Sequence, residues 1–151
     1  MSTESRPSAG REGGHGRDRL YHALLAASAA AVLGVARALT PSTSGQGTHE
    51  QLGLPPCSFH WITGHGCPGC GLTTSFAFFV RGDLLGAFRA NPVGLLLATA
   101  TALSVPLLIY RVIWPAPIDD LLTSRWLTRG LLGLMVLMFV VWFVRLALGV
   151  I

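Results

Sequence analysis

Three long apolar runs without formal charge constrain this chain more than any other feature of its sequence. They cover residues 20–36, 93–110 and 130–144. A helix that crosses a bilayer needs roughly 20 mostly apolar residues, with about 17 as the lower limit. The first two runs reach this length, and the third reaches it when it continues past Arg145 to residue 151. Arg145 must then extend its guanidinium to the lipid headgroups or face a partner helix.

The composition agrees with a membrane protein. Hydrophobic residues make up 51% of the 151 residues and charged residues only 12%. Buried helices of a soluble α-helical protein are the alternative, but three apolar runs with so few polar faces disfavour it. The positive charge comes from arginine alone, and the arginines are scattered, so no nucleic-acid surface is indicated. The sequence therefore predicts an all-α membrane protein whose main partner is the lipid bilayer.

Charge also predicts how the chain is oriented. Residues 1–19 are rich in Gly, Ser and Arg and lack apolar periodicity, which predicts a disordered tail. The positive-inside rule places this tail and the arginine-bearing loop 111–129 in the cytoplasm. We expect a single membrane domain over residues 20–151, with transmembrane helices near 20–39, 92–114 and 129–150.

The first run has two further interpretations. Ala36-Arg37-Ala38 resembles a signal-peptide cleavage site, but the arginine inside it and the length of the run favour an uncleaved anchor. Small residues four apart would let another helix approach closely, so self-association or contact with another membrane protein is a hypothesis. An alanine-rich composition without a partner explains the same pattern. The small residues are Ala26, Ala30, Gly34 and Ala38.

Residues 41–91, between the first two predicted spans, form a cysteine-containing loop followed by a short hairpin. Residues 41–66 contain no Lys or Arg, which favours the exterior. Residues 72–80 are apolar but too short to cross a bilayer, and Arg81-Gly82-Asp83 interrupts them. Asp83 can cap a second short helix, and Asn91-Pro92 is typical of the start of another. We expect an interfacial or re-entrant helical hairpin. The alternative is a span over 72–90, whose two charges at mid-depth would cost several kcal/mol.

The chemistry of the chain is concentrated in its three cysteines. Cys67 and Cys70 form a Cys-x-x-Cys motif, and Cys57 lies upstream. His60 and His65 lie within eight residues of the cysteines, whereas His49 receives no predicted role. Zinc is bound by four Cys or His ligands in structural sites, so three cysteines and one of the two nearby histidines would suffice. The lack of a second Cys-x-x-Cys pair counts against this hypothesis.

Two other chemistries remain open for the same thiols. Cys67 and Cys70 could be a redox pair, with Cys67 or Cys70 activated at a helix N-terminus. No thioredoxin-like βαβ pattern accompanies the motif. Alternatively, Cys57 pairs with Cys67 or Cys70 in a disulfide that fixes the loop to the hairpin.

The spaced motifs around the cysteines resemble a family of bacterial membrane proteins of unknown function, DUF2752. The resemblance covers roughly residues 57–114. It implies an integral membrane protein and supplies no biochemical activity. Members commonly carry arginine where this chain has Thr74, so a role that needs a cation beside the cysteines is not supported here. The motifs are Cys57, Thr63-Gly64, residues 67–73, Gly82-Asp83, Ala87-Phe88 and Asn91-Pro92.

These observations lead to two functional hypotheses. The first is a non-enzymatic accessory or scaffold protein of the bacterial inner membrane, with its N-terminus in the cytoplasm. Its exterior cysteine cluster would be disulfide-bonded or would bind a metal such as zinc through Cys57, Cys67, Cys70 and His60 or His65. The second is a membrane thiol–disulfide oxidoreductase that uses Cys67 and Cys70. No phosphate-binding glycine loop, serine nucleophile motif or His-Glu-x-x-His motif is present.

Overall fold

The protein is all-helical in the part of the chain that the computed structural model describes, residues 12–114 and 125–149. No strand occurs in these residues, which confirms the predicted fold class. The elements in chain order are α1 (Glu12–Ala38), the 3₁₀ helix η1 (Thr48–Leu52), α2 (Ser58–Thr63), α3 (Leu72–Phe79), α4 (Leu84–Ala90), α5 (Pro92–Ile113) and α7 (Arg125–Ala147).

Three of these helices are long and apolar enough to cross a membrane. The candidate spanning segments are Gly16–Ala38, Pro92–Ile113 and Thr128–Ala147, in the regions of the three apolar runs. Helix α1 begins at Glu12, inside the segment predicted as a tail, and α7 begins at Arg125. The difference arises because an apolar run defines the part of a helix that lipid can cover, whereas the helix itself can continue into water. Residues 1–11 of the predicted tail and 115–124 of the predicted loop lie outside the described residues.

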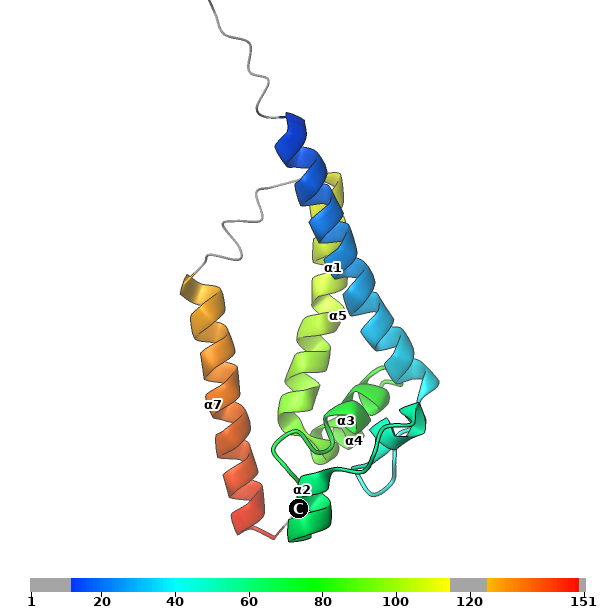
Figure 1. Ribbon diagram of the computed structural model, residues 1–151, viewed down its shortest axis with the longest axis vertical. Coiled ribbons are helices and arrows are strands. Elements are labelled where there is room, and N and C mark those ends of the chain that lie inside the picture. Colours follow the sequence, from blue (N-terminus) through cyan, green and yellow to red (C-terminus); the bar gives the residue numbers. More distant parts are fainter. Residues whose placement is uncertain (1–11, 115–124, 150–151) are drawn as a thin grey trace, which may run out of the picture.

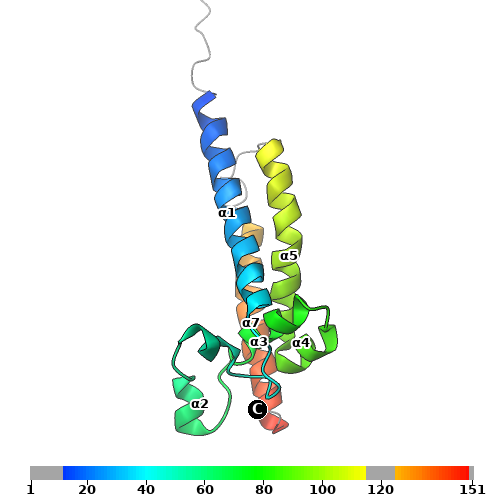
Figure 2. The ribbon, with the colours of Figure 1, turned by 90° about the vertical axis from the view of Figure 1, so that its right-hand side faces the viewer.

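The long helices are arranged so that the cysteine-containing segment lies at one end of the molecule. Helix α1 packs against α5 and α3, and α3, α4 and α5 pack together. Figure 1 shows α2, α3 and α4 gathered where α1 ends and α5 begins, with the last turns of α7 at the same level. In the turned view of Figure 2, α1 and α5 again run side by side. We call residues 36–94, with the last two turns of α7, the cysteine-bearing end.

The segment 72–90 is a hairpin of two short helices, as predicted, and not one long helix. Asp83 caps α4, because its Oδ1 accepts a hydrogen bond from the Gly86 N–H at 2.7 Å. Asn91 caps α5 in the same way, accepting from the Gly94 N–H at 3.0 Å, and Pro92 is the first helical residue. Both caps satisfy N–H groups that a helix start leaves without an intrahelical partner.

Arg81, which the sequence placed in the break of the hairpin, joins the hairpin to α1. Its guanidinium donates to the backbone carbonyl of Ala77 at 2.7 Å and to those of Ala36, Arg37 and Leu39. The last carbonyls of a helix lack intrahelical donors and carry a partial negative charge. A cation at the end of α1 therefore satisfies these carbonyls.

Arg145 has a similar role in α7. It donates to the carbonyl of Ala90 at 2.9 Å and to that of Arg89 at 3.0 Å, at the end of α4. Of the two positions that its sequence context allowed, the structure therefore shows contact with a neighbouring helix. The half-buried residues of α7 form one stripe, which faces the rest of the molecule: Leu134, Met138, Val141, Trp142, Arg145 and Leu146.

The core consists mostly of alanine, which allows backbones to approach closely. Ala36, Ala77, Ala87, Ala90 and Ala98 are all buried. Of the small-residue series on α1, Ala26 is buried, whereas Ala30, Gly34 and Ala38 are exposed. A Cβ added at Gly34 would meet nothing within 4 Å. Most of this series is therefore not used for packing within the described part of the chain, and its contact with another chain stays a prediction.

Candidate functional site

Cys57 lies at the start of α2. It is the N-cap residue of this helix, with φ −60° and ψ 114°, and its carbonyl accepts from the Trp61 N–H at 2.9 Å. The Cys57 side chain is half-buried. In Figure 1, α2 lies at the edge of the cysteine-bearing end, away from the long helices α1 and α5. Cys57 is therefore carried by a peripheral element.

Cys67 and Cys70 lie in a tight turn that leads into α3. The Cys70 N–H donates to the Cys67 carbonyl at 2.9 Å, which brings the two side chains to the same side of the turn. The turn ends at Gly71, the N-cap of α3, which has φ 82°. A Cβ at Gly71 would lie 2.5 Å from the Ala90 carbonyl oxygen, so both the backbone angle and the packing require glycine.

Two side chains hold this turn against the helices. The Asn91 amide donates to the Cys70 carbonyl at 3.1 Å while its oxygen caps α5. The Trp142 indole N–H donates to the Gly66 carbonyl at 2.7 Å. The turn that carries two of the cysteines is therefore bound to both α5 and α7.

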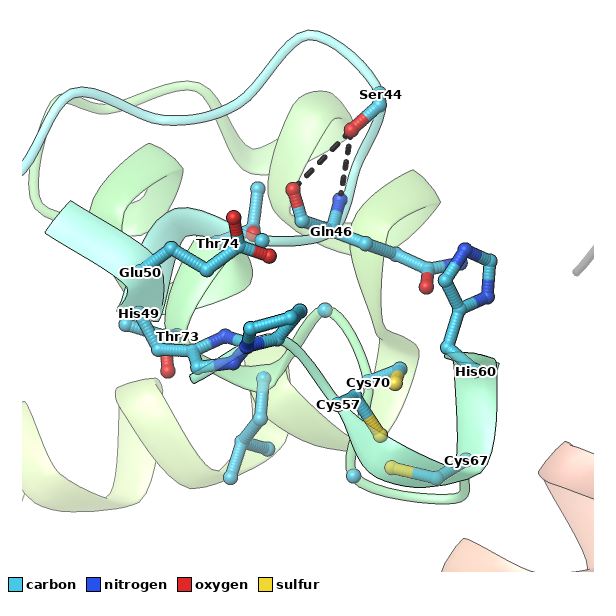
Figure 3. A pocket seen from close by; sticks show the side chains of 15 residues that line it. Ser44, Gln46, His49, Glu50, Cys57, His60, Cys67, Cys70, Thr73 and Thr74 are labelled. Carbon is cyan, nitrogen blue, oxygen red and sulfur yellow. Dashed lines mark hydrogen bonds between the residues drawn. The ribbon is translucent and has the colours of Figure 1, made fainter. Parts of the chain in front are cut away.

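The three cysteine sulfurs converge. The Sγ atoms of Cys57, Cys67 and Cys70 all lie within 4.8 Å of one another, and the three thiols are unbridged. Figure 3 shows the three side chains pointing toward a common point. Two sulfurs bound to one tetrahedral zinc ion, each about 2.3 Å from it, lie about 3.8 Å apart. The three sulfurs would therefore have to move together by up to about 1 Å for all three to bind the same ion.

The thiols differ in acidity. The backbone N–H of His60, in the first turn of α2, lowers the pKa of Cys57 to about 7. Burial, together with the adjacent Cys67 thiol, raises the pKa of Cys70 to about 12. Cys57 therefore becomes a thiolate, the form that attacks electrophiles and binds metals, more readily than Cys70 does.

A cavity of about 450 Å³ adjoins the cysteines. Its wall includes His49 and Glu50 of η1, which the sequence gave no reason to place there. They reach the cavity because Thr48 and Thr74 share a buried hydrogen bond of 2.8 Å that holds η1 on α3. Two threonines far apart in the sequence give no local signal of such a bond. The other polar lining residues are Ser44, Gln46, His60, Thr73 and Thr74.

The two predicted histidine ligands take different positions. His60 lines the cavity, although its side chain is exposed. His65 is exposed, is not part of the wall, and places its Nδ1 2.8 Å from the Thr63 carbonyl oxygen. Within the described residues, the group of metal-ligating side chains that converge consists of the three cysteines.

Thr74, where the family resemblance led us to expect arginine, is a buried side chain. Thr74 is 1% exposed and is bonded to Thr48. A cation nevertheless lies near the cysteines, because Arg145 lines a small cavity together with Cys67 and Cys70. The sequence could not show this position of Arg145, because it depends on the packing of α7.

The fold and the site define an all-helical protein with three helices of membrane-spanning length and three converging cysteines at one end. Residues 57–105 match the family described as a protein of unknown function (DUF2752). The match begins at Cys57 and takes in the cysteine turn, the hairpin and most of α5, so the predicted resemblance is confirmed over this segment. No curated protein and no solved structure matches the chain.

Proposed function

We propose that this protein is an accessory protein of the bacterial inner membrane that binds a thiophilic metal ion, Zn²⁺ in the first instance, through Cys57, Cys67 and Cys70. One observation carries the proposal: three unbridged sulfurs, from two separate elements, lie within 4.8 Å of one another. Three thiolates form a soft donor set that suits zinc. Arginines in residues 1–19 and 111–129 support a cytoplasmic N-terminus and hence an exterior site.

His60 is the first choice for a fourth ligand. It follows Cys57 by three residues in α2, which places both on one side of this helix, and it lines the same cavity. His65 would have to leave its position beside the Thr63 carbonyl to reach the sulfurs. Water is the alternative in the fourth position, and the site would then be open to the cavity.

The proposed role of the metal is structural. Cys57 belongs to the peripheral α2, whereas Cys67 and Cys70 belong to the turn fixed by Asn91 and Trp142. An ion shared by the three would fix α2 to the hairpin. Helix α2 exposes Trp61 and Ile62, which are 82% and 75% exposed, so its position determines where these apolar side chains are presented.

Metal analysis of the full chain, purified in detergent without chelators, tests the proposal. We expect zinc at close to one ion per chain, lost in Cys57→Ser and Cys67→Ser and retained in the matched control Ser58→Ala. His60→Ala and His65→Ala then identify the fourth ligand, with only the first expected to weaken zinc retention. Absence of metal, even after added zinc, would overturn the proposal.

Intact-mass measurement under non-reducing conditions separates the competing chemistries. A protein with free thiols has the mass of the unmodified chain. A metal-bound protein, measured under native conditions, adds the mass of the ion less the protons that it displaces, whereas a disulfide lowers the mass of the chain by that of two hydrogens. An oxidoreductase predicts that Cys70→Ser traps mixed disulfides through Cys67. A trapped partner would replace the metal proposal with thiol exchange.

A further inference from the structure

A second cavity, of about 370 Å³, lies between the end of α1 and α3, next to the cysteine cavity. Its wall is apolar except for the hydroxyl of Thr73. We call it the α1–α3 crevice. Its volume falls in the range of about 300–1,000 Å³ that is usual for small-molecule sites. Its lining residues are Ala31, Val32, Val35, Ala36, Leu39, Leu72, Thr73 and Phe76.

The crevice is built from one face of each helix. The α1 residues recur at the spacing of a helical stripe, and so do Leu72, Thr73 and Phe76 of α3. The opposite face of α3 is hydrogen-bonded to the second half of the hairpin, because the Ser75 hydroxyl donates to the carbonyls of Ala87 and Asn91. Arg81 fixes the end of α1 over the hairpin. The walls of the crevice are therefore held in place by hydrogen bonds outside it.

The crevice opens sideways, toward the position of lipid. Ala36 and Leu39, at its base, are 3% and 6% exposed, whereas Val32 and Val35, at its rim, are 50% and 46% exposed. Val32, Val35 and Ala36 belong to the candidate spanning segment of α1, and Leu39 directly follows it. The side of such a helix is surrounded by hydrocarbon chains, so a chain can enter without crossing water.

The crevice and the cysteine cavity share part of their walls. Leu72 and Thr73 line both. The wall of the cysteine cavity carries hydrogen-bonding side chains and one carboxylate, that of Glu50. No arginine belongs to the described part of this wall. A different cavity, of about 570 Å³, is lined by Arg89 and Arg145 and would suit a phosphate better. The cysteine cavity thus favours an uncharged polar group over an anionic one.

We propose that the α1–α3 crevice and the cysteine cavity together bind one amphipathic lipid with a single apolar chain and an uncharged, hydrogen-bonding head. The chain lies between α1 and α3, and the head passes Thr73 into the cavity lined by His49 and the cysteines. This site goes beyond the proposed metal binding, and its chain-binding part does not depend on the metal, because the crevice contains no cysteine.

Photolabelling of the full chain tests the lipid site. The probe is a monoacylglycerol with a diazirine in its acyl chain, applied to protein in lipid nanodiscs, with labelled residues identified by peptide mass spectrometry. We expect labels within residues 31–39 and 72–76, competed by unlabelled monoacylglycerol. Val35→Trp fills the crevice, and excluding even two methylenes lowers affinity about tenfold. The matched control is Leu103→Trp, at an exposed position of α5.

Two further measurements keep the test decisive. Labelling that is unchanged in Val35→Trp, or equally strong with a diazirine lysophosphatidate, would overturn the proposal. Thr73→Val keeps the shape of the wall but removes its hydroxyl, so the preference for monoacylglycerol over lysophosphatidate should fall even if Val35→Trp does not fold. Zinc content is measured on the same samples. Cys57→Ser should lose zinc and keep its labels, so failure of one proposal is distinguishable from failure of the other.

Discussion

The cysteine-bearing end and the opposite halves of the long helices use their polar side chains in different ways. At the cysteine-bearing end, Arg81, Asn91 and Arg145 bond to carbonyls of other elements. In the middle of α5, Thr99 and Thr101 bond to carbonyls one turn earlier in the same helix, at 2.8 Å. Because lipid is as apolar as a leucine side chain, apolar faces alone give helices little reason to prefer one partner. Polar bonds between elements therefore determine which helices meet at the cysteine-bearing end.

The most damaging change should be Gly71→Ala, at the junction of the cysteine turn and α3. Alanine would take up an unfavourable φ of 82° and place its Cβ 2.5 Å from the Ala90 carbonyl. Together, strain and overpacking should lower the free energy of unfolding by about 2–5 kcal/mol. Denaturant unfolding in detergent, followed by tryptophan fluorescence, measures this loss.

Gly53→Ala is the matched control. Gly53 has φ 75°, but a Cβ there meets nothing within 4 Å, so only strain of about 1 kcal/mol is expected. Equal losses of unfolding free energy in the two variants would show that close packing against Ala90 adds nothing to the cost of the backbone strain at Gly71.

The same contrast between fixed and peripheral parts occurs within the cysteine-bearing end, and alkylation should reveal it. In metal-free, reduced protein, the pKa of Cys57 near 7 and that of Cys70 near 12 give Cys57 far more thiolate at neutral pH. Allowing for the lower nucleophilicity of a more acidic thiol, Cys57 should react about a hundredfold faster with iodoacetamide. Its rate should rise from pH 6 to 8 and then level off. Equal rates in timed peptide mass spectrometry would contradict the assignment.

Arg81→Ala should destabilise the junction of α1 and the hairpin. It removes a cation that donates to four carbonyls, three of them at the end of α1. Hydrogen bonds to charged groups are stronger than neutral ones, but an exposed side chain loses part of that advantage to water. The free energy of unfolding should therefore fall by an amount on the order of 2–3 kcal/mol. Arg89→Ala, at an exposed position of the hairpin, should cost much less in the same unfolding measurement.

Thr101→Val, away from the cysteine-bearing end, should have the smallest effect. Its hydroxyl bonds only to the Leu97 carbonyl of its own helix, and that carbonyl keeps its helical donor. We expect a change within about 0.5 kcal/mol. A loss as large as that of Arg81→Ala would abolish the distinction between the two ends.

The sequence predicted those features that depend on neighbouring residues. Apolar runs predicted the candidate spans. Asp83 and Asn91 predicted two helix starts, because aspartate and asparagine are favoured N-cap residues and capping acts within one turn. Cys57 was predicted as a third member of the cluster and is found there. The positions of His49 and Arg145 could not be predicted, since they depend on the Thr48–Thr74 bond and on the packing of α7, which join residues far apart in the chain.

The attachment of α7 has a consequence for biogenesis. Ribosomes make α7 last among the described helices, yet Trp142 and Arg145 supply the donors for the carbonyls of Gly66, Arg89 and Ala90. Until α7 has been synthesised and inserted, the turn that carries Cys67 and Cys70 lacks these restraints. The nascent protein therefore passes through a stage in which its thiols are already made but not yet held by α7. Oxidation or metal capture during that interval would act on a looser site than the one in the finished fold.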